Sequence, residues 1–318
     1  GTSEFTVWAR AMWKQSRTGA KLLRFLRGAS LGLAATALSF AHPGSGIVVD
    51  AHRQIYFVDT GQGVWKLGAD GKPALIHKLA YHWMAIDEKG HFANSQSLGD
   101  FDGGSFVRIT PPGAVPAVVI SSDFPIAVGR DGGLYYVPYN RAGRRELIRR
   151  MPNGQRSVFA TLPASAGPKP ALWINGIASA PDGSLYVTDD DAIRKIDKDG
   201  KVSTVRESVH LQDCANPLPG VPKLPLFRGL AVAGDGTIYA AANGCRAVVS
   251  IPLKGAVKTI LTAEPPWSPT GVALSGNDIL ILEYLHTSGD DRKEWVPRVR
   301  RITSGGKIAT VVAIERQP

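Results

Sequence analysis

Six positions along the chain could supply chemistry at one place. Each stands directly before a short apolar segment that ends in a turn: Ser45, His82, Phe124, Asn175, Arg228 and Thr270. Four of these side chains can hydrogen-bond a ligand without carrying a fixed charge, and Arg228 could hold an anion. We therefore predict that Ser45, Asn175 and Thr270 bind a ligand. His82 and Arg228 are predicted catalytic residues, with His82 as a general base.

A second set of polar residues follows further along, where the second apolar segment of each unit ends: Asp59, Ser95, Pro138, Asp189 with Asp190, Asn243 and Glu283. Carboxylates are thus expected in this wider, outer set, and the cation Arg228 in the inner set. We predict that Asp59 and Asn243 contribute to ligand binding. Glu283 is a third predicted catalytic residue, which would move protons together with His82.

Each of these groups also has an ordinary structural interpretation. His82 lies between Tyr81 and Trp83 and could be a packed, hydrogen-bonded histidine. Arg228 could neutralise Glu283 or Asp189 rather than bind substrate. Runs such as Asp189 to Asp191 are typical of turns.

The elements that must position these residues recur along the chain. Residues 175–198, NGIASAPDGSLYVTDDDAIRKIDK, read as three short strands separated by two turns. Similar segments begin at Gly44, Tyr81, Asp123, Phe227 and Ser268, at intervals of about 37 to 53 residues. Each is followed by a fourth strand: ALIHKL from Ala74, AVVIS from Ala117, SVFATL from Ser157, VSTV from Val202, AVKTIL from Ala256 and KIATVV from Lys307.

Six copies of four strands predict an all-β fold, a six-bladed β-propeller with four antiparallel strands per blade. An open sandwich is the alternative. In such blades the turn after the second strand and the link to the next blade emerge on one side. Regular Asp-Gly turns, Asp131-Gly132, Asp182-Gly183 and Asp235-Gly236, mark the other side as structural hairpins. Chemistry is expected on the first, more variable side.

The segments NGIASAPDGSLYVTDD and RGLAVAGDGTIYAA resemble those of NHL-repeat propellers. The wider group contains the senescence-marker-protein/gluconolactonase family, the paraoxonases and the strictosidine-synthase-like proteins. The resemblance covers about residues 44 to 314. It implies a hydrolase that acts on a small ester, lactone or phosphotriester, with a divalent metal, typically calcium, at the channel mouth. The alternative is a binding propeller without catalysis that holds a peptide, a glycan or a small ligand.

The metal ligands implied by the resemblance are only partly present. Asn175 matches the family's Asn-Gly motif, whereas Ser45, Phe124 and Arg228 stand where Glu, Asn and Asp are expected. A relocated calcium site would use Asn175, Asp189 and Glu283, because oxygen ligands suit this ion. These three residues are the predicted metal set.

The N-terminal residues 1–41 read as a vector scar, GTSEF, followed by a leader that resembles a secretory signal. Six Lys and Arg residues precede the apolar run ASLGLAATALSFA, which is too short to span a bilayer comfortably. Cleavage after Ala41 would leave a propeller at residues 42–318, secreted or periplasmic and without a membrane span. An amphipathic or buried N-terminal helix is the alternative.

The charge of the chain gives little support for nucleic-acid binding. The net charge is +10, but residues 1–41 hold six of the 37 basic and one of the 27 acidic residues, which leaves +5 for the rest. Local basic clusters occur at Arg144, Arg145, Arg149 and Arg150, and again at Arg292, Lys293, Arg298, Arg300 and Arg301. We interpret them as solvated outer faces, because no aromatic residues are interleaved with them. The predicted partner is a small molecule.

Both cysteines fall on the variable side. Cys214 lies in a Pro-rich insertion, residues 211–227 between blades four and five, and Cys245 follows the second strand of blade five. A disulfide between them would suit an exported protein. Two free thiols are the alternative, and the spacing excludes a CxxC zinc site.

Overall fold

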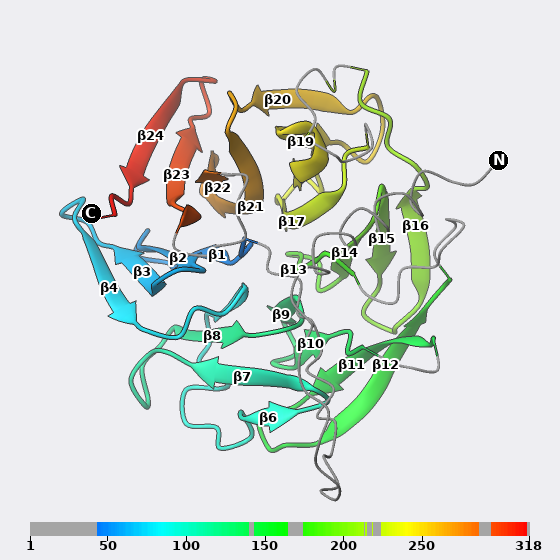
Figure 1. Ribbon diagram of the computed structural model, residues 1–318. Helices are drawn as coiled ribbons and strands as arrows, with labels where there is room; N and C mark the ends of the chain where they lie inside the picture. Colours follow the sequence, from blue (N-terminus) through cyan, green and yellow to red (C-terminus); the bar gives the residue numbers. More distant parts are fainter. Residues whose placement is uncertain are drawn as a thin grey trace, which may run out of the picture. The chain divides into compact units, whose positions relative to one another are not determined.

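Six antiparallel sheets of four strands each surround a common centre in the computed structural model (Figure 1). The structure describes residues 43–139, 143–164, 174–212, 214, 218, 224–285 and 294–316. The predicted all-β, six-bladed propeller is confirmed. The predicted leader falls on residues 1–41, which lie outside the described residues.

Five blades are simple meanders in which strand order follows the chain. Blade one comprises β1 (Ile47–Val49), β2 (Ile55–Asp59), β3 (Gly63–Leu67) and β4 (Pro73–His77). Blade three comprises β9 (Ile126–Val128), β10 (Leu134–Tyr136), β11 (Arg145–Arg150) and β12 (Arg156–Leu162). Blade four comprises β13 (Gly176–Ser179), β14 (Leu185–Asp189), β15 (Ala192–Ile196) and β16 (Val202–Arg206). Blade five comprises β17 (Phe227–Val232), β18 (Ile238–Ala242), β19 (Ala247–Ile251) and β20 (Lys258–Thr262), with a short 3-10 turn η1 (Asn243–Cys245). Blade six comprises β21 (Trp267–Ser275), β22 (Asp278–Leu285), β23 (Pro297–Ile302) and β24 (Ile308–Ala313).

Blade two differs from the expected meander. It comprises β5 (Trp83–Asp87), β6 (Asp100–Phe101), β7 (Gly104–Arg108) and β8 (Ala117–Ser121), in the order β5-β8-β7-β6. The expected second strand around Ser95 is absent, because residues 91–99 form turns and irregular backbone. The segment AVVIS, expected at the outer edge, instead pairs directly with the inner strand β5.

Burial explains this placement of β8. All five of its residues are buried, whereas the outer strands β4 and β16 contain no buried residue. A short, continuously apolar run is typical of a strand covered on both faces. AVVIS therefore stabilises the blade more from an interior position than from its exposed edge.

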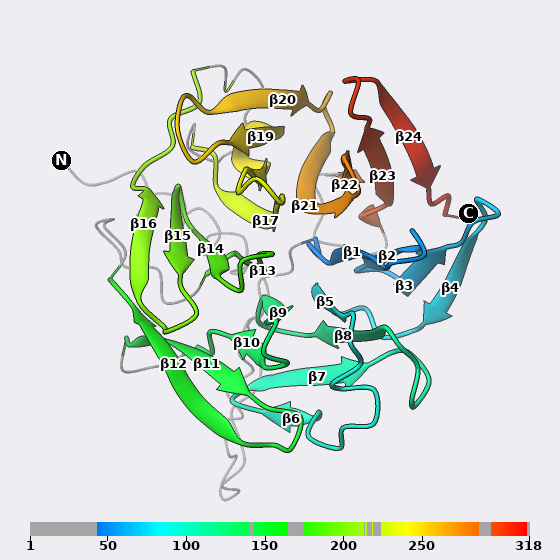
Figure 2. The same ribbon diagram turned by 180° about the vertical axis from the view of Figure 1, so that it is seen from behind.

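The inner strands β1, β5, β9, β13, β17 and β21 pack against one another in sequence, and β21 also packs against β1. Figure 2 shows the six strands around the centre of the ring. Apolar side chains fill the space between neighbouring blades. One cluster joins blades four and five through Tyr186, Phe227 and Val249, and another joins blades two and three through Phe106, Phe124 and Tyr136. Burial between blades supplies the main driving force for the ring.

The ring closes without an exchanged strand, since blade one is entirely N-terminal and blade six entirely C-terminal. Side chains join the two ends of the propeller instead. The Tyr284 hydroxyl donates to the Val58 carbonyl at 2.6 Å. Beyond β24, Arg316 donates from Nη1 and Nη2 to the Asp59 carboxylate at 2.7 and 2.6 Å.

The Asp-Gly hairpins between first and second strands are confirmed. Gly132, Gly183 and Gly236 have φ values of +82°, +85° and +83°, which glycine adopts without steric cost. In blade four the preceding aspartate, Asp182, accepts a bond from the Ser184 amide at 2.9 Å, and the other two turns repeat this bond. The described residues contain no helix with the length and apolar character needed to cross a membrane.

Candidate functional site

The residues predicted to precede the inner strands lie around the centre of the propeller. Ser45, His82, Phe124 and Asn175 do precede β1, β5, β9 and β13, whereas Arg228 and Thr270 lie at register shifts within β17 and β21. Glycines after these residues allow the close approach: a Cβ on Gly176 would lie 2.2 Å from the Arg228 carbonyl oxygen. A Cβ on Gly271 would lie 2.3 Å from the Ser45 carbonyl oxygen. Since no side chain fits there, the Asn-Gly, Arg-Gly and Thr-Gly pairs of the sequence are explained by backbone contact between neighbouring blades.

Direct hydrogen bonds connect three of the predicted site residues. The Ser45 amide donates to the His82 carbonyl oxygen at 2.8 Å, and Arg228 Nε donates to Ser45 Oγ at 3.1 Å. These residues come from blades one, two and five. We call Ser45, His82 and Arg228 the inner site.

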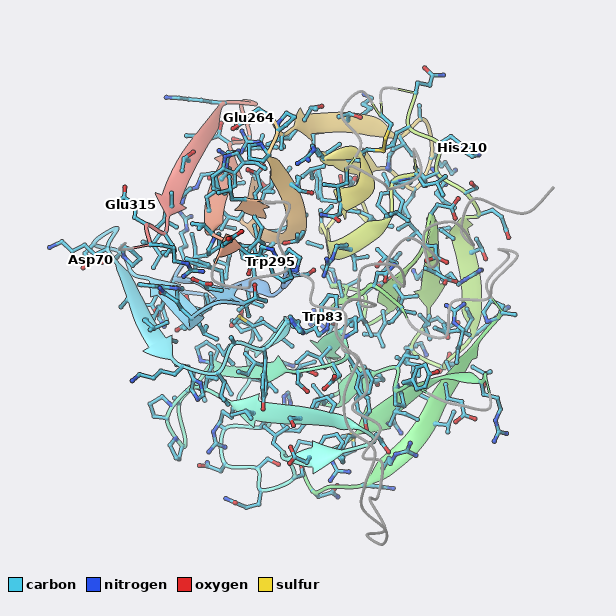
Figure 3. The ribbon with its side chains drawn as sticks, in the orientation of Figure 1. Asp70, Trp83, His210, Glu264, Trp295 and Glu315 are labelled. Atoms are coloured by element: carbon cyan, nitrogen blue, oxygen red, sulfur yellow. A yellow bond between two sulfur atoms is a disulfide. The ribbon has the colours of Figure 1, made fainter. Side chains whose placement is uncertain are left out.

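Arg228 extends from blade five towards blades one and two. Its Nη2 donates to the Pro43 carbonyl oxygen at 2.7 Å, and its guanidinium carbon lies 5.8 Å from the centre of the Trp83 ring. Figure 3 shows Trp83 near the centre of the propeller. Burial lowers the pKa of Arg228 to about 10, which still leaves the side chain charged at neutral pH. The inner site therefore carries a positioned positive charge.

His82 is buried, with 8% of its surface exposed, and it is held by the end of β8 and by the link from β8 to β9. Its amide donates to the Ser121 carbonyl oxygen at 3.1 Å, and Nδ1 lies 2.8 Å from the Ser122 carbonyl oxygen. A carbonyl oxygen only accepts, so Nδ1 carries the proton and Nε2 of the neutral ring is the basic nitrogen. The changed strand order of blade two brings this link beside His82.

The other inner positions differ in their surroundings. Asn175 is partly exposed, and its amide donates to the Thr188 carbonyl oxygen at 3.0 Å. Thr270 is fully buried, with Oγ1 3.5 Å from the Leu282 carbonyl oxygen. Phe124 packs with Phe106 in the apolar cluster between blades two and three. Ligand binding by Ser45, Asn175 and Thr270 stays a prediction.

The predicted outer residues are engaged in contacts with other side chains and backbone groups. Asp189 accepts from Arg145 Nη2 of blade three at 2.5 Å and from Arg194 Nε at 2.6 Å. Glu283 accepts from Arg298 Nε at 2.6 Å and from Arg300 Nη2 at 2.7 Å.

Asp59 and Asn243 join neighbouring blades in the same way. Asp59 holds Arg316 of the C-terminal segment and accepts from Trp65 Nε1 at 3.2 Å. Asn243 Nδ2 of blade five donates to Ser268 Oγ and to the Pro269 carbonyl oxygen of blade six, at 2.7 and 3.0 Å. We call Asp59, Asp189, Asn243 and Glu283 the outer ring. The contacts of Asp59, Asp189 and Asn243 connect a blade to its neighbour or to the C-terminal segment, whereas those of Glu283 join β22 to β23 within blade six.

Two of the three predicted calcium ligands already have cationic partners, and calcium binding stays a prediction. Asp189 and Glu283 are 3% and 0% exposed, and two guanidinium groups already satisfy each carboxylate. In the part of the chain that the structure describes, no group of three His, Cys, Asp or Glu residues could hold a metal ion. At the inner site the positive charge belongs to Arg228, and a divalent cation beside it would be repelled.

The predicted disulfide is confirmed, since Cys214 and Cys245 are bonded to each other. Both residues are buried. The bond ties the insertion to the turn after β18, on the same side as the inner site. Residues 213, 215–217 and 219–223 of the insertion lie outside the described residues.

The arginine partners of the outer ring were not predicted. The sequence clusters around Arg145 and Arg298 are expected on solvated faces, yet these two residues are only 2% and 9% exposed. The sequence contains a signal that Arg145 is buried. Residues i and i+2 of a strand lie on the same face, and Arg145 shares its face with Leu147, which is fully buried. The expectation of solvated faces is therefore wrong at both residues.

No family model matches the chain, and no curated protein matches its sequence. Solved structures do share its fold. Virginiamycin B lyase from Staphylococcus aureus is 16% identical with a TM-score of 0.50, over 86% of this chain and 85% of that one. A streptogramin B lyase is 14% identical with a TM-score of 0.51, over 88% and 86%.

A gluconolactonase from Xanthomonas campestris is 14% identical with a TM-score of 0.43, over 85% of this chain and 76% of that one. The class that the strand topology defines is the six-bladed β-propeller. The two lyase matches, with TM-scores of 0.50 and 0.51, agree with this chain in fold alone.

Proposed function

We propose that the protein is a hydrolase that acts on a small ester, lactone or phosphotriester at the inner site without a metal ion. One observation carries the proposal: a cationic guanidinium and a histidine with a basic Nε2 are linked through Ser45 at the centre of the propeller. Solved structures of similar fold include lyases, so this architecture accommodates enzymes, while the hydrolase class itself is proposed from the inner site.

In this proposal, substrate binding must first give access to His82 Nε2, which is enclosed in this structure. His82 Nε2 then accepts a proton from water as the oxygen attacks the carbonyl carbon or the phosphorus of the substrate. Arg228 stabilises the negative charge that develops on the substrate oxygen, a contribution otherwise expected from a metal ion. His82 then returns the proton to the leaving oxygen. The Ser122 carbonyl keeps the proton on Nδ1 and so fixes the tautomer that this sequence requires.

The test is a substrate panel of lactones, aryl esters and phosphotriesters, assayed with and without EDTA. We expect turnover that EDTA does not change. Arg228→Lys keeps a charge but loses the planar guanidinium, so we expect a lower kcat with a smaller change in KM. Arg206→Lys, which changes an arginine on outer strand β16, is the matched control.

Loss of activity in EDTA that calcium restores would show that the metal-independent proposal is wrong. Absence of turnover on the whole panel, together with retention of a ligand by the folded protein, would favour a binding propeller. The engagement of the four outer-ring side chains in structural contacts is the observation that favours this second function.

We also infer that the protein is exported. The buried disulfide between Cys214 and Cys245 supports this, because disulfides persist in oxidising compartments. Expression of the full chain followed by cell fractionation tests it. Recovery of the protein with reduced cysteines inside the cytoplasm would contradict a secreted or periplasmic location.

A further inference from the structure

Blades three and five each contain a buried arginine with the same kind of backbone contact. Arg145 lies at the start of β11, and Arg246 lies directly before β19. Each donates from Nη1 to backbone carbonyls beyond the fourth strand: Arg145 to Pro163, and Arg246 to Pro266 and Trp267. The two residues are 2% and 4% exposed, and Nε of each is enclosed without a partner.

The two arginines differ at Nη2. In blade three this nitrogen donates to Asp189 of the next blade. The corresponding acid beyond Arg246 is Glu283 of blade six, which Arg298 and Arg300 already hold. Among the described residues, no carboxylate lies within ion-pair distance of Arg246. Nη2 is therefore the nitrogen of Arg246 that a ligand can use.

The surroundings of Arg246 favour an anion. Burial lowers the pKa of its guanidinium, and no neighbouring charge opposes that effect. Arginine nevertheless keeps its proton in proteins, so an enclosed charge remains that an anionic partner would stabilise. The carboxylates of Glu264 and Glu283 pair with Arg298 and Arg300, so among the described residues neither of them forms an ion pair with Arg246.

An apolar surface accompanies the charge. Arg246 Nη1 bonds the Trp267 carbonyl oxygen, and the Trp267 ring lies 4.0 Å from the guanidinium carbon of Arg298. Trp267 is partly exposed. Figure 3 labels Glu264, which lies at the same seam between blades five and six. A ligand with a planar body could pack near the indole while its acidic group meets Arg246.

We propose that Arg246 binds the carboxylate of a small ligand through Nη2, at the seam between blades five and six on the side of the inner site. Ala242, at the end of β18, pairs with Phe227 at the start of β17 and with Ala247 at the start of β19. The starts of β17 and β19 therefore lie at the same edge of blade five. The site therefore lies on the same side as Arg228 but two strands further from the centre. It does not depend on the proposed hydrolase activity.

The test compares benzoate with benzamide, its uncharged counterpart, by isothermal titration calorimetry at constant ionic strength. All variants carry Arg228→Gln, so that the inner site cannot contribute a second anion contact. We expect saturable binding of benzoate and none of benzamide. Arg246→Gln should weaken benzoate binding about tenfold or more, the size of a lost charge-assisted hydrogen bond.

Arg301→Gln is the matched control, because it removes the same charge from a side chain that is 41% exposed. It should leave benzoate binding unchanged. If Arg246→Gln does not fold, as judged by circular dichroism, Arg246→Lys replaces it and should weaken binding less. Equal benzoate affinity in the Arg246 and Arg301 variants, equal binding of benzamide, or no saturable binding of benzoate would each overturn the proposal.

Discussion

The inner site and the outer ring use ionisable side chains in opposite ways. Asp189 and Glu283 of the outer ring are almost fully enclosed, and each is neutralised by two arginines. At the inner site, the described contacts of Arg228 and His82 include backbone carbonyl oxygens and Ser45. The carboxylates that suggest catalysis in the sequence thus form structural ion pairs, whereas the proposed chemistry depends on a cation and an imidazole.

The strongest test of this contrast is His82→Gln at the inner site. Loss of the basic Nε2 should lower kcat about 10²- to 10⁴-fold on any substrate that the panel identifies. Unfolding in urea should change far less, because glutamine can still donate to the Ser122 carbonyl oxygen. His210→Gln is the control, since His210 is exposed. Unchanged kcat in the His82 variant would remove His82 from the mechanism.

At the outer ring we expect a large effect on stability instead of on kcat. Glu283→Gln leaves Arg298 and Arg300 without their buried carboxylate, so we expect the free energy of unfolding to fall by about 3 to 5 kcal/mol. Glu264→Gln is a matched control, because Glu264 contacts the same two arginines but is 57% exposed, and it should cost less than about 1 kcal/mol. Urea denaturation followed by tryptophan fluorescence measures both. Equal losses would mean that burial does not distinguish the two acids.

The sequence predicts the two regions unequally. Asp182-Gly183 and similar turns follow from local chemistry, and the structure contains them where expected. Of the residues expected before the inner strands, Arg228 and Thr270 instead lie within β17 and β21. Ion pairs such as Asp59 with Arg316 join residues 257 positions apart, and no local pattern encodes such a contact.

Blade two shows a second reason for failure. Periodicity identifies AVVIS as a strand but does not say which strand it pairs with. Its continuous apolar character was the available signal, since true outer strands such as β4 carry exposed residues throughout most of their length. The position of His82 depends on this pairing, because β8 leads into the Ser121 and Ser122 carbonyls that hold it.

A moderate effect is expected where the outer ring closes the propeller. Arg316→Gln removes the charged partner of Asp59, whose carboxylate is fully buried, although the arginine itself is 18% exposed. We expect the free energy of unfolding to fall by about 1 to 3 kcal/mol. Arg301→Gln, at 41% exposure, is the control and should change little. A loss no larger than that of the control would mean that apolar packing alone closes the ring.

The smallest effect should come from an ion pair outside both regions. Burial alone would raise the pKa of Asp102, but hydrogen bonds from Arg156 and Tyr136 outweigh it, so the net shift is downward. A lowered pKa in the folded state adds stability above the unfolded value of about 4, and this stability is lost as the pH falls through the lower, folded value. Because Arg156 is 41% exposed, Asp102→Asn should cost less than about 1 kcal/mol near neutral pH. Urea denaturation at pH 7 and at stepwise lower pH should show the difference from the parent protein shrinking below about pH 4. A difference that grows on acidification would show that Arg156 and Tyr136 do not lower the pKa of Asp102. Partial exposure would then no longer distinguish this ion pair from the buried acids of the outer ring.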